Sequence, residues 1–341
     1  MARVLVARPR LDCSFKRGTV PAEEGAPLNN VLSLFGTFID NLENHFKACG
    51  WEVSSDKRPL WQFELEQLQK AAKSFDLVFF PHKLASQFPI GPNTLYYKTT
   101  PIPEFLTVDH SGWGASLSFL PVEPEFTRET LSFYRELQKR IDANQSVFSQ
   151  PPSSQHLSAA DYLLFVCQVP HDETIQYHSK VTVEEALAAV IAYAERRGRK
   201  LLVKGHPANR KAMALFKAMT EDSKAATWVD DTSIHTCLAG AERVFMVNSG
   251  VGFEAMLHGK TVVHFGNAEY SNVHLRSAPD ADAIQALENE RVSTETMAAF
   301  LHTFFKNAIR YDDPDTYGKV LGKYMRNQQA TEHLPPPVTG L

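Results

Sequence analysis

The feature that most constrains this chain is the stretch 245–272, FMVNSGVGFEAMLHGKTVVHFGNAEYSN, which reads as strand, glycine turn, helix and strand in close succession. The apolar run at 243–247 predicts a buried parallel strand, and 261–265 predicts a second one. Gly250 and Gly252 follow the first strand directly, and a residue without a Cβ lets the backbone come close to a ligand. A chain built around such a unit is expected to form a parallel α/β sheet.

The turn at the start of this helix has the chemistry of an anion site. Backbone amides at Ser249 to Gly252, placed after the carboxyl end of a parallel strand, suit a phosphate or a carboxylate. Asn248 or Ser249 would make a good N-cap for the helix. Glu254 lies in the first helical turn, where its carboxylate can accept hydrogen bonds from ribose hydroxyls. A tight turn with a capped helix and no ligand is the plain structural alternative.

Length and composition narrow the class of protein. A chain of 341 residues exceeds the usual size of one core, so two domains are expected. The net charge of −4 argues against general nucleic-acid binding, which needs a basic face. The cysteines are far apart in the sequence, so neither a zinc site nor a disulfide framework is predicted: Cys13, Cys49, Cys167 and Cys237.

The same composition predicts where the protein works. No apolar stretch is long enough to cross a bilayer, and the first residues read as a strand rather than a signal peptide. We therefore expect a cytoplasmic protein with reduced cysteines. Any work on a membrane-linked molecule would be done from the membrane surface.

The first half of the chain alternates predicted strands and helices. Strands are predicted at 2–7, 51–53, 77–80, 94–98 and 105–108, with helices at 31–49, 61–74 and 129–143. Loops after two of these strands carry His82 with Lys83 and Asp109 with His110. If the two sheets oppose each other, Asp109 faces the crevice, so it is predicted as the catalytic acid/base, with His110 in reserve. A solvated turn at His82 and an Asx-turn at Asp109 are the structural alternatives.

Domain boundaries follow from composition. Serine, glutamine and proline replace apolar residues at 146–158, which predicts a linker. The expected division is a first α/β domain at 1–150, a second α/β domain at 159–292, helices at 293–330 and a disordered tail at 331–341. The last helix is expected to pack back on the first domain.

The second half repeats the α/β alternation and collects polar residues after its strands. Strands are predicted at 162–169, 201–203 and 227–229, and Thr182 with Glu185 forms a capping box before a helix. Asp172 follows the first strand, Lys204 and His206 follow the second, and the glycine turn follows a later one. Because carboxyl ends of parallel strands share one edge of the sheet, these groups are expected to converge.

Three motifs of the second half resemble a known family. They are QVPHDETI at 168–175, KGHP at 204–207 and NSGVGFEAMLHGKTVVHFGNAEY at 248–270. They are similar, in this order, to segments of the bacterial retaining β-Kdo glycosyltransferases of capsule and lipopolysaccharide synthesis. The resemblance covers roughly 162–272. DHSGWGAS at 109–116 matches only loosely the acidic, glycine-containing loop of the family's first domain.

The resemblance implies a GT-B fold with two facing Rossmann-like domains. It further implies CMP-Kdo as donor, no metal or other cofactor, and transfer of β-Kdo with retention to a bacterial surface glycan or glycolipid, such as an O-antigen, a capsule linker or another lipopolysaccharide acceptor. The residues expected to act on the donor are Asp172 as nucleophile, Lys204, His206 as phosphate ligand or acid, Asn248, Ser249, Gly250, Gly252, Glu254 and Tyr270 as a lid or base contact.

The sequence also allows other functions and other roles for two of these residues. A CMP-sialic acid sialyltransferase of the GT-B fold shares the His-Pro turn, and a non-catalytic nucleotide-sugar or polysaccharide-binding protein or a nucleotide-sugar epimerase would use the same frame. Asp172, with Glu173 beside it, also suits a helix cap before Thr174. His206 could be a structural turn histidine.

Overall fold

The computed structural model describes residues 1–9, 28–148, 150–151, 161–207 and 211–331. The chain divides into two compact units, one formed by 1–113 with 307–341 and the other by 114–306. The linker predicted at 146–158 therefore does not coincide with this division, and α3 (Thr130–Asp142) belongs to the second unit. The predicted tail beyond Thr331 lies outside the described residues.

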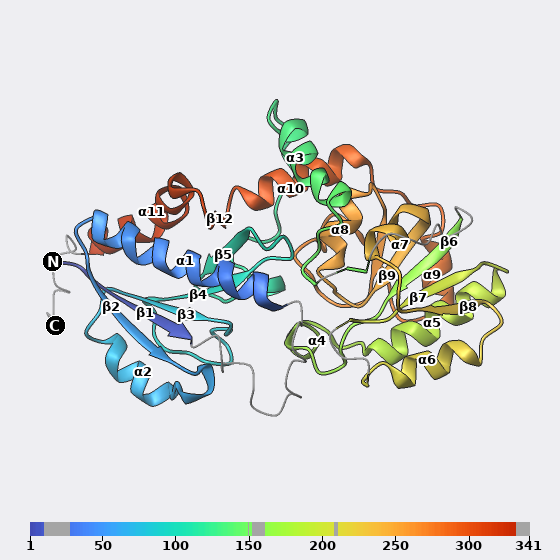
Figure 1. Cartoon of the computed structure of the whole chain (residues 1–341), viewed down its shortest axis with the longest axis horizontal. Helices are drawn as coiled ribbons and strands as arrows, with labels where there is room; N and C mark the ends of the chain where they lie inside the picture. The colour runs from blue at the N-terminus through green and yellow to red at the C-terminus, as the bar shows by residue number, and fades with distance from the viewer. Residues whose placement is uncertain (10–27, 149, 152–160, 208–210, 332–341) are drawn as a thin grey trace, which may run out of the picture. The chain divides into compact units, whose positions relative to one another are not determined.

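The first unit contains a mostly parallel sheet with the strand order β12-β5-β4-β3-β1-β2. Its strands are β1 (Arg3–Pro9), β2 (Glu52–Arg58), β3 (Leu77–Pro81), β4 (Thr94–Thr99), β5 (Phe105–Asp109) and β12 (Ile309–Arg310). Helix α1 (Leu28–Ala48) and helix α11 (Pro314–Thr331) lie side by side, in blue and red in Figure 1, on one face. Helix α2 (Leu65–Ala72), preceded by the 3₁₀ turn η1 (Leu60–Gln62), covers the other face.

One strand of this sheet runs against the prediction. β5 pairs with β4 in the antiparallel direction, with Tyr96 opposite Asp109. The connection between the two strands, 100–104, is too short for the crossover that parallel neighbours require. The expectation of a wholly parallel first sheet is therefore wrong at this edge, where β12 also pairs antiparallel with β5.

The second unit contains a parallel sheet with the order β11-β10-β9-β6-β7-β8. Its strands are β6 (Tyr162–Val166), β7 (Leu201–Lys204), β8 (Ala226–Val229), β9 (Ala241–Met246), β10 (Val262–His264) and β11 (Leu275–Arg276). Side chains alternate between the faces along each strand. Phe165, Val203 and Phe245 enter one hydrophobic cluster, whereas Lys204 and His264 are on the opposite face.

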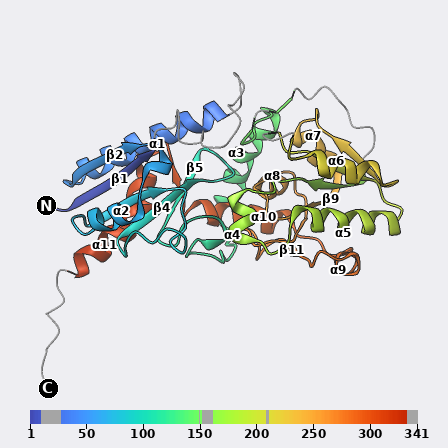
Figure 2. The same cartoon turned by 90° about the horizontal axis from the view of Figure 1, so that it is seen from below.

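Helices cover both faces of the second sheet (Figure 1). Helices α5 (Val183–Arg196), α6 (Ala214–Glu221) and α9 (Ala281–Ala286) pack on the face of that cluster. Helices α7 (Ile234–Gly240) and α8 (Val251–Leu257) lie on the other face, with α3 (Thr130–Asp142) and α10 (Thr294–Phe305) against α8. Figure 2 shows α5 and α9 side by side from below. Two short helices complete the described chain, η2 (Gly114–Ser116) and α4 (Glu173–His178).

The predicted capping box of α5 is confirmed. The side chain of Thr182 accepts a hydrogen bond from the amide of Glu185, and the Glu185 carboxylate accepts one from the amide of Thr182. These two hydrogen bonds satisfy the amides of Thr182 and Glu185, which have no acceptor within the helix. This fixes where α5 begins and therefore how it covers the sheet.

Candidate functional site

The carboxyl edge of the second sheet gathers the polar residues that the sequence singles out. Because β7, β6, β9 and β10 are parallel neighbours, the segments that follow them lie next to one another. Gln168 follows β6, Lys204 ends β7, Asn248 follows β9 and His264 ends β10. This is the edge at which open parallel sheets bind ligands.

Asn248 links three of these segments. Its amide nitrogen donates to the carbonyls of Thr174 and Asn267, at 2.9 and 3.2 Å. Its Oδ1 accepts from Gln168 Nε2 at 3.0 Å, and its backbone N–H donates to Gln168 Oε1 at 2.9 Å. The side chain is 1% exposed. In this structure Asn248 therefore holds α4 and the loop after β10 against the end of β9, while its predicted contact with a donor stays a prediction.

The glycine turn is closed by its own hydrogen bonds. The hydroxyl of Ser249 accepts from the amide of Val251 at 3.2 Å, and the carbonyl of Ser249 accepts from the amide of Gly252 at 3.0 Å. The N-cap position of α8 is Gly250, which has no side chain to cap the helix. The amides of Val251 and Gly252 therefore already have acceptors, and an anion at this turn would meet the amide of Gly250 and the hydroxyl of Ser249 first.

Tyr270 lies beneath this turn and is fully buried. Its hydroxyl donates to the carbonyl of Ser249 at 2.7 Å, and its ring occupies the space that a Cβ on Gly252 would need. The absence of a Cβ at Gly252 thus accommodates a tyrosine ring. In this structure Tyr270 therefore supports the turn from below, while its role as a lid or a contact of the base stays a prediction.

Lys204 and His206 lie at the end of β7. The Lys204 ammonium donates to the carbonyls of Asp230 and Gly205, and burial lowers its pKa. Burial also lowers the pKa of His206 to about 4, against the opposing effect of the Asp172 carboxylate, and the ring of Phe148 meets it edge-on at 4.9 Å. Without a bound anion, His206 is therefore neutral at pH 7.

Asp172 is the N-cap of α4 and is exposed. Its Oδ1 accepts from the amide of Thr174 at 2.7 Å, so Asp172 caps the helix as its sequence position allows. Its charge is also close enough to His206 to raise the pKa of that imidazole. The structure thus brings Asp172 and His206 together. The nucleophilic role of Asp172 stays a prediction.

Glu254 is enclosed on the α7 side of the same edge. Its carboxylate is 3% exposed, and burial raises its pKa to about 7, against a hydrogen bond from Ser146 and the charge of Arg140. His235 Nε2 lies 3.9 Å from Oε1 and also contacts the carbonyl of Gln145 at 2.8 Å. The segment 145–146 therefore lies beside the Glu254 carboxylate. If Glu254 binds a ribose as predicted, this segment has to move.

Asp109 is buried in the first unit and accepts a hydrogen bond from the amide of Ser111 at 2.8 Å. This is an Asx-turn contact. Because β5 is antiparallel to β4, Asp109 lies opposite Tyr96 instead of following the last residue of a parallel strand. His110 contacts the carbonyl of Thr94 through Nδ1 at 2.9 Å. Acid/base catalysis by either residue stays a prediction.

Several residues at the site were not predicted to act there. Gln168 clamps Asn248, and Phe148 packs on His206 although it lies in the predicted linker. His264 and His274 contact the ring of Tyr270 edge-on, at 5.7 and 5.5 Å. The sequence signal for these two residues was a histidine within an apolar strand, His264, and one in the loop after it, His274. The alternation of residues along a strand does not show whether such a histidine is buried.

Within the described ranges, no three His, Cys, Asp or Glu side chains are grouped so that they could hold a metal ion. Among the same residues, no helix is both long enough and apolar enough to span a bilayer.

Comparison with known proteins adds the family. The sequence profile of the family described as "Capsule polysaccharide biosynthesis protein" matches residues 103–312, which is more than half of the chain. The chain belongs to this family. No curated protein sequence matches the chain.

Solved structures similar to this member of the family include two from Thermosulfurimonas dismutans KpsC. One is its β-Kdo 2,4 transferase, with 16% identity, 86% of this chain and 89% of that chain covered, and a TM-score of 0.50. The other is its β-Kdo 2,7 transferase, with 12% identity, 95% and 100% covered, and a TM-score of 0.52. At these identities the likeness establishes the fold. The resemblance to capsule enzymes and the GT-B-like α/β class are thus confirmed at the level of family and fold.

Proposed function

We propose that this protein is a retaining glycosyltransferase that moves β-Kdo from CMP-β-Kdo to a bacterial surface glycan or glycolipid. The observation that carries the proposal is the grouping of Asp172, Lys204, His206 and the Ser249 turn at the carboxyl edge of one parallel sheet. The capsule family and the fold shared with two β-Kdo transferases support it. Cytoplasmic location and peripheral contact with the inner membrane belong to the same proposal.

The donor phosphate meets groups that suit an anion without requiring a metal. The amide of Gly250 and the hydroxyl of Ser249 donate hydrogen bonds, and Lys204 supplies positive charge. A bound phosphate raises the pKa of His206 from about 4, because the anion favours the protonated imidazole. His206 then becomes able to protonate the departing CMP. Full activity in EDTA is expected, whereas loss in EDTA with recovery in manganese would contradict this step.

Retention at the anomeric carbon is explained by two inversions. The Asp172 carboxylate attacks the anomeric carbon of Kdo, the bond from that carbon to the phosphate oxygen breaks, and CMP leaves with the electron pair. An acceptor hydroxyl then attacks the same carbon, gives up its proton to a base, and releases the Asp172 carboxylate. Asp109 is the proposed base, and a near-normal transfer rate in Asp109→Ala would assign that role to another group.

The test of Asp172 uses a substitution that keeps its cap. Asparagine also caps helices well, so Asp172→Asn retains the bond to the amide of Thr174 but cannot form the glycosyl ester. The matched control is Asp280→Asn, because Asp280 is an exposed cap of the short helix α9 in the same unit. We expect Asp172→Asn to abolish Kdo transfer while CMP binding and thermal stability stay as in Asp280→Asn.

Mass spectrometry of the intact protein gives an independent measurement. After incubation with CMP-Kdo and no acceptor, one added Kdo should map to the peptide containing Asp172. An adduct on another residue, or an active Asp172→Asn variant, would assign the nucleophile elsewhere. Release of CMP from CMP-sialic acid but not from CMP-Kdo would identify the protein as a sialyltransferase. Binding of the donor without turnover would identify it as a non-catalytic binding protein.

A further inference from the structure

The contact between Tyr270 and the glycine turn fixes one peptide plane of the candidate site. The carbonyl of Ser249 accepts two hydrogen bonds, from the Tyr270 hydroxyl at 2.7 Å and from the Gly252 amide at 3.0 Å. Both hold this carbonyl oxygen toward the interior. A trans peptide is planar, so the N–H of Gly250, on the same peptide, points the opposite way.

The ring of Tyr270 is held on all sides. A Cβ on Gly252 would lie 2.3 Å from its Cε1 and 2.4 Å from its Cζ, so ring and turn are in direct contact. His264, His274 and Phe253 meet the ring edge-on at centroid distances of 5.7, 5.5 and 5.8 Å. A fully buried ring with such neighbours has one position, and the Ser249 carbonyl is bound to its hydroxyl.

We propose that Tyr270 is a positioning residue of the donor site, which orients the Ser249–Gly250 peptide so that the Gly250 amide faces the donor phosphate. This inference rests on the proposed function, and it gives Tyr270 a role that needs no contact with the nucleotide. The Tyr270 hydroxyl orients the Gly250 amide through the Ser249 carbonyl. Residue 252 is a glycine because a Cβ there would collide with the Tyr270 ring. A donor already aimed at the phosphate needs no reorganisation during the reaction.

The second unit contains a matched pair at its other edge. Tyr162, the first residue of β6, is 5% exposed and donates through its hydroxyl to the carbonyl of Cys237 at 2.8 Å. A Cβ on Gly240 would lie 2.7 Å from that hydroxyl. The two tyrosines thus make the same contacts, a hydroxyl to a carbonyl and a ring to a glycine. Tyr162 lies at the amino edge, away from the candidate site.

The experiment compares Tyr270→Phe with Tyr162→Phe in the full chain. Each variant keeps its ring and loses one hydroxyl-to-carbonyl bond, so similar losses of thermal stability are expected. In Tyr270→Phe we expect kcat/KM for CMP-Kdo to fall about tenfold, the effect of about one well-placed hydrogen bond on the transition state. In Tyr162→Phe we expect a change of less than about twofold by the same reasoning. Equal kinetic losses in both variants, or none in Tyr270→Phe, would overturn the proposal.

Hydrogen exchange of the backbone amides gives a readout that does not depend on Kdo transfer. Tyr270→Phe should speed the exchange of the amides at 249–252 more than Tyr162→Phe does. If the wild-type protein transfers no Kdo, the proposed function fails while this comparison still decides the role of Tyr270. Unchanged exchange at 249–252 would refute the positioning role even in an active enzyme.

A second substitution tests the ring contact. Gly252→Ala places a methyl group within 2.4 Å of ring atoms and must displace Tyr270, so it should lower kcat/KM more than Tyr270→Phe. Gly240→Ala is its control, since it crowds Tyr162 in the same way. A Gly252→Ala protein with wild-type kcat/KM would contradict the proposal.

Discussion

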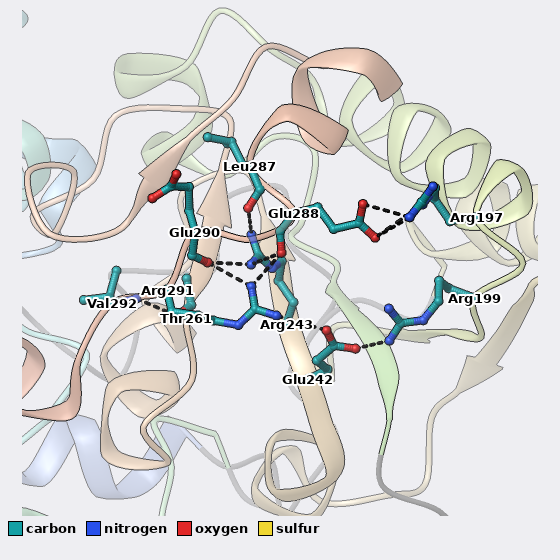
Figure 3. A network of polar contacts seen from close by, with 10 residues as sticks. All are labelled: Arg197, Arg199, Glu242, Arg243, Thr261, Leu287, Glu288, Glu290, Arg291 and Val292. Atoms are coloured by element: carbon teal, nitrogen blue, oxygen red, sulfur yellow. Dashed lines mark hydrogen bonds and ion pairs between the residues drawn. The ribbon is translucent and has the colours of Figure 1, made fainter.

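The two ends of strand β9 bind backbone carbonyls by different means. At its amino end Arg243 is 3% exposed and donates to the carbonyls of Leu287, Glu288 and Glu290, at 2.7, 3.0 and 2.6 Å (Figure 3). Just past its carboxyl end, Asn248 donates to the carbonyls of Thr174 and Asn267. Each residue ties a loop to the sheet, one with a charged group and the other with a neutral amide.

The surroundings of the two ends differ more than the anchors do. Around Arg243, charged groups are paired and partly exposed, including Arg197 with Glu288 and Arg199 with Glu242 (Figure 3). Around Asn248, ionisable groups are buried in their neutral forms: burial lowers the pKa of His264 to about 4 and that of His274 to about 3. Burying such groups lowers stability, so their concentration at the carboxyl edge indicates a site kept for function.

The largest effect on stability is expected at the amino end. Arg243→Leu leaves three carbonyls without their charged donor, and we expect the free energy of unfolding to fall by about 3 kcal/mol or more. Arg291→Gln is the control, because Arg291 is about half exposed and its loss should matter by less than about 1 kcal/mol. Denaturant unfolding measures both. Equal losses would show that the network acts as a unit, without a central role for Arg243.

Kinetics of the same variants sharpen the comparison. The turnover of Arg243→Leu, corrected for its folded fraction, should equal that of the wild-type protein. A specific loss of transfer would show that the amino edge also shapes the site, and the contrast between the two ends of β9 would fail.

Much of the second unit is predictable from its sequence because its structure is local. Short apolar runs, glycine stops and the Thr182 capping box predict β6, β7, β9 and β10 in a parallel sheet, and their ends locate the site. Edge strands are less visible. β2 extends from Glu52 to Arg58 through a polar sequence, although the apolar pattern ends at Val53, because an edge strand needs little burial.

The details of the site depend on contacts that a local pattern does not contain. Asn248 binds Thr174 and Asn267, far away in the sequence, and Tyr270 supports a turn that precedes it by some twenty residues. The direction of β5 was readable in principle, from the short connection 100–104. Residue types at strand ends therefore predict where chemistry occurs, whereas the role of each side chain depends on tertiary packing.

At the carboxyl end, Asn248→Ala should lower both stability and activity. It removes the side-chain donor to the carbonyls of Thr174 and Asn267, and we expect the free energy of unfolding to fall by about 2 kcal/mol. Because Thr174 follows Asp172 on α4, kcat for Kdo transfer should also fall. Comparison with the corrected turnover of Arg243→Leu separates the two ends of β9. The anchoring role predicts that Asn248→Ala loses stability and activity together. An Asn248→Ala protein with wild-type stability would contradict it, whether its transfer is slow or normal.

The carboxyl edge is expected to contribute to the dependence of stability on pH. The pKa of His264 is about 4 when folded and about 6.5 when unfolded, so the unfolded chain binds more protons between these values. Its contribution is therefore full above pH 6.5 and is lost as the pH falls toward 4. Glu254, with its raised pKa of about 7, acts in the opposite direction and is present in both proteins compared below.

His264→Asn isolates this contribution. His264 Nδ1 lies 2.7 Å from the carbonyl of Gly266 and donates to it, and an asparagine amide can replace that donor. We expect the loss of unfolding free energy between pH 7 and pH 5 to be smaller in the variant by about 1 to 2 kcal/mol. Denaturant unfolding at the two pH values measures it. Parallel pH curves for variant and wild type would show that His264 binds protons equally in the folded and unfolded chains, so that folding does not lower its pKa.

The smallest effect is expected for a surface ion pair on the amino side of the second unit. Arg196 and Asp282 approach to 2.5 Å, but their side chains are 43% and 81% exposed. Water and salt screen such a pair, so Arg196→Ala should change the free energy of unfolding by less than about 0.5 kcal/mol. Repeating the measurement in high salt should remove even that. A larger loss of unfolding free energy would mean that exposed ion pairs also stabilise the amino edge. Arg243 would then not be its main stabilising residue.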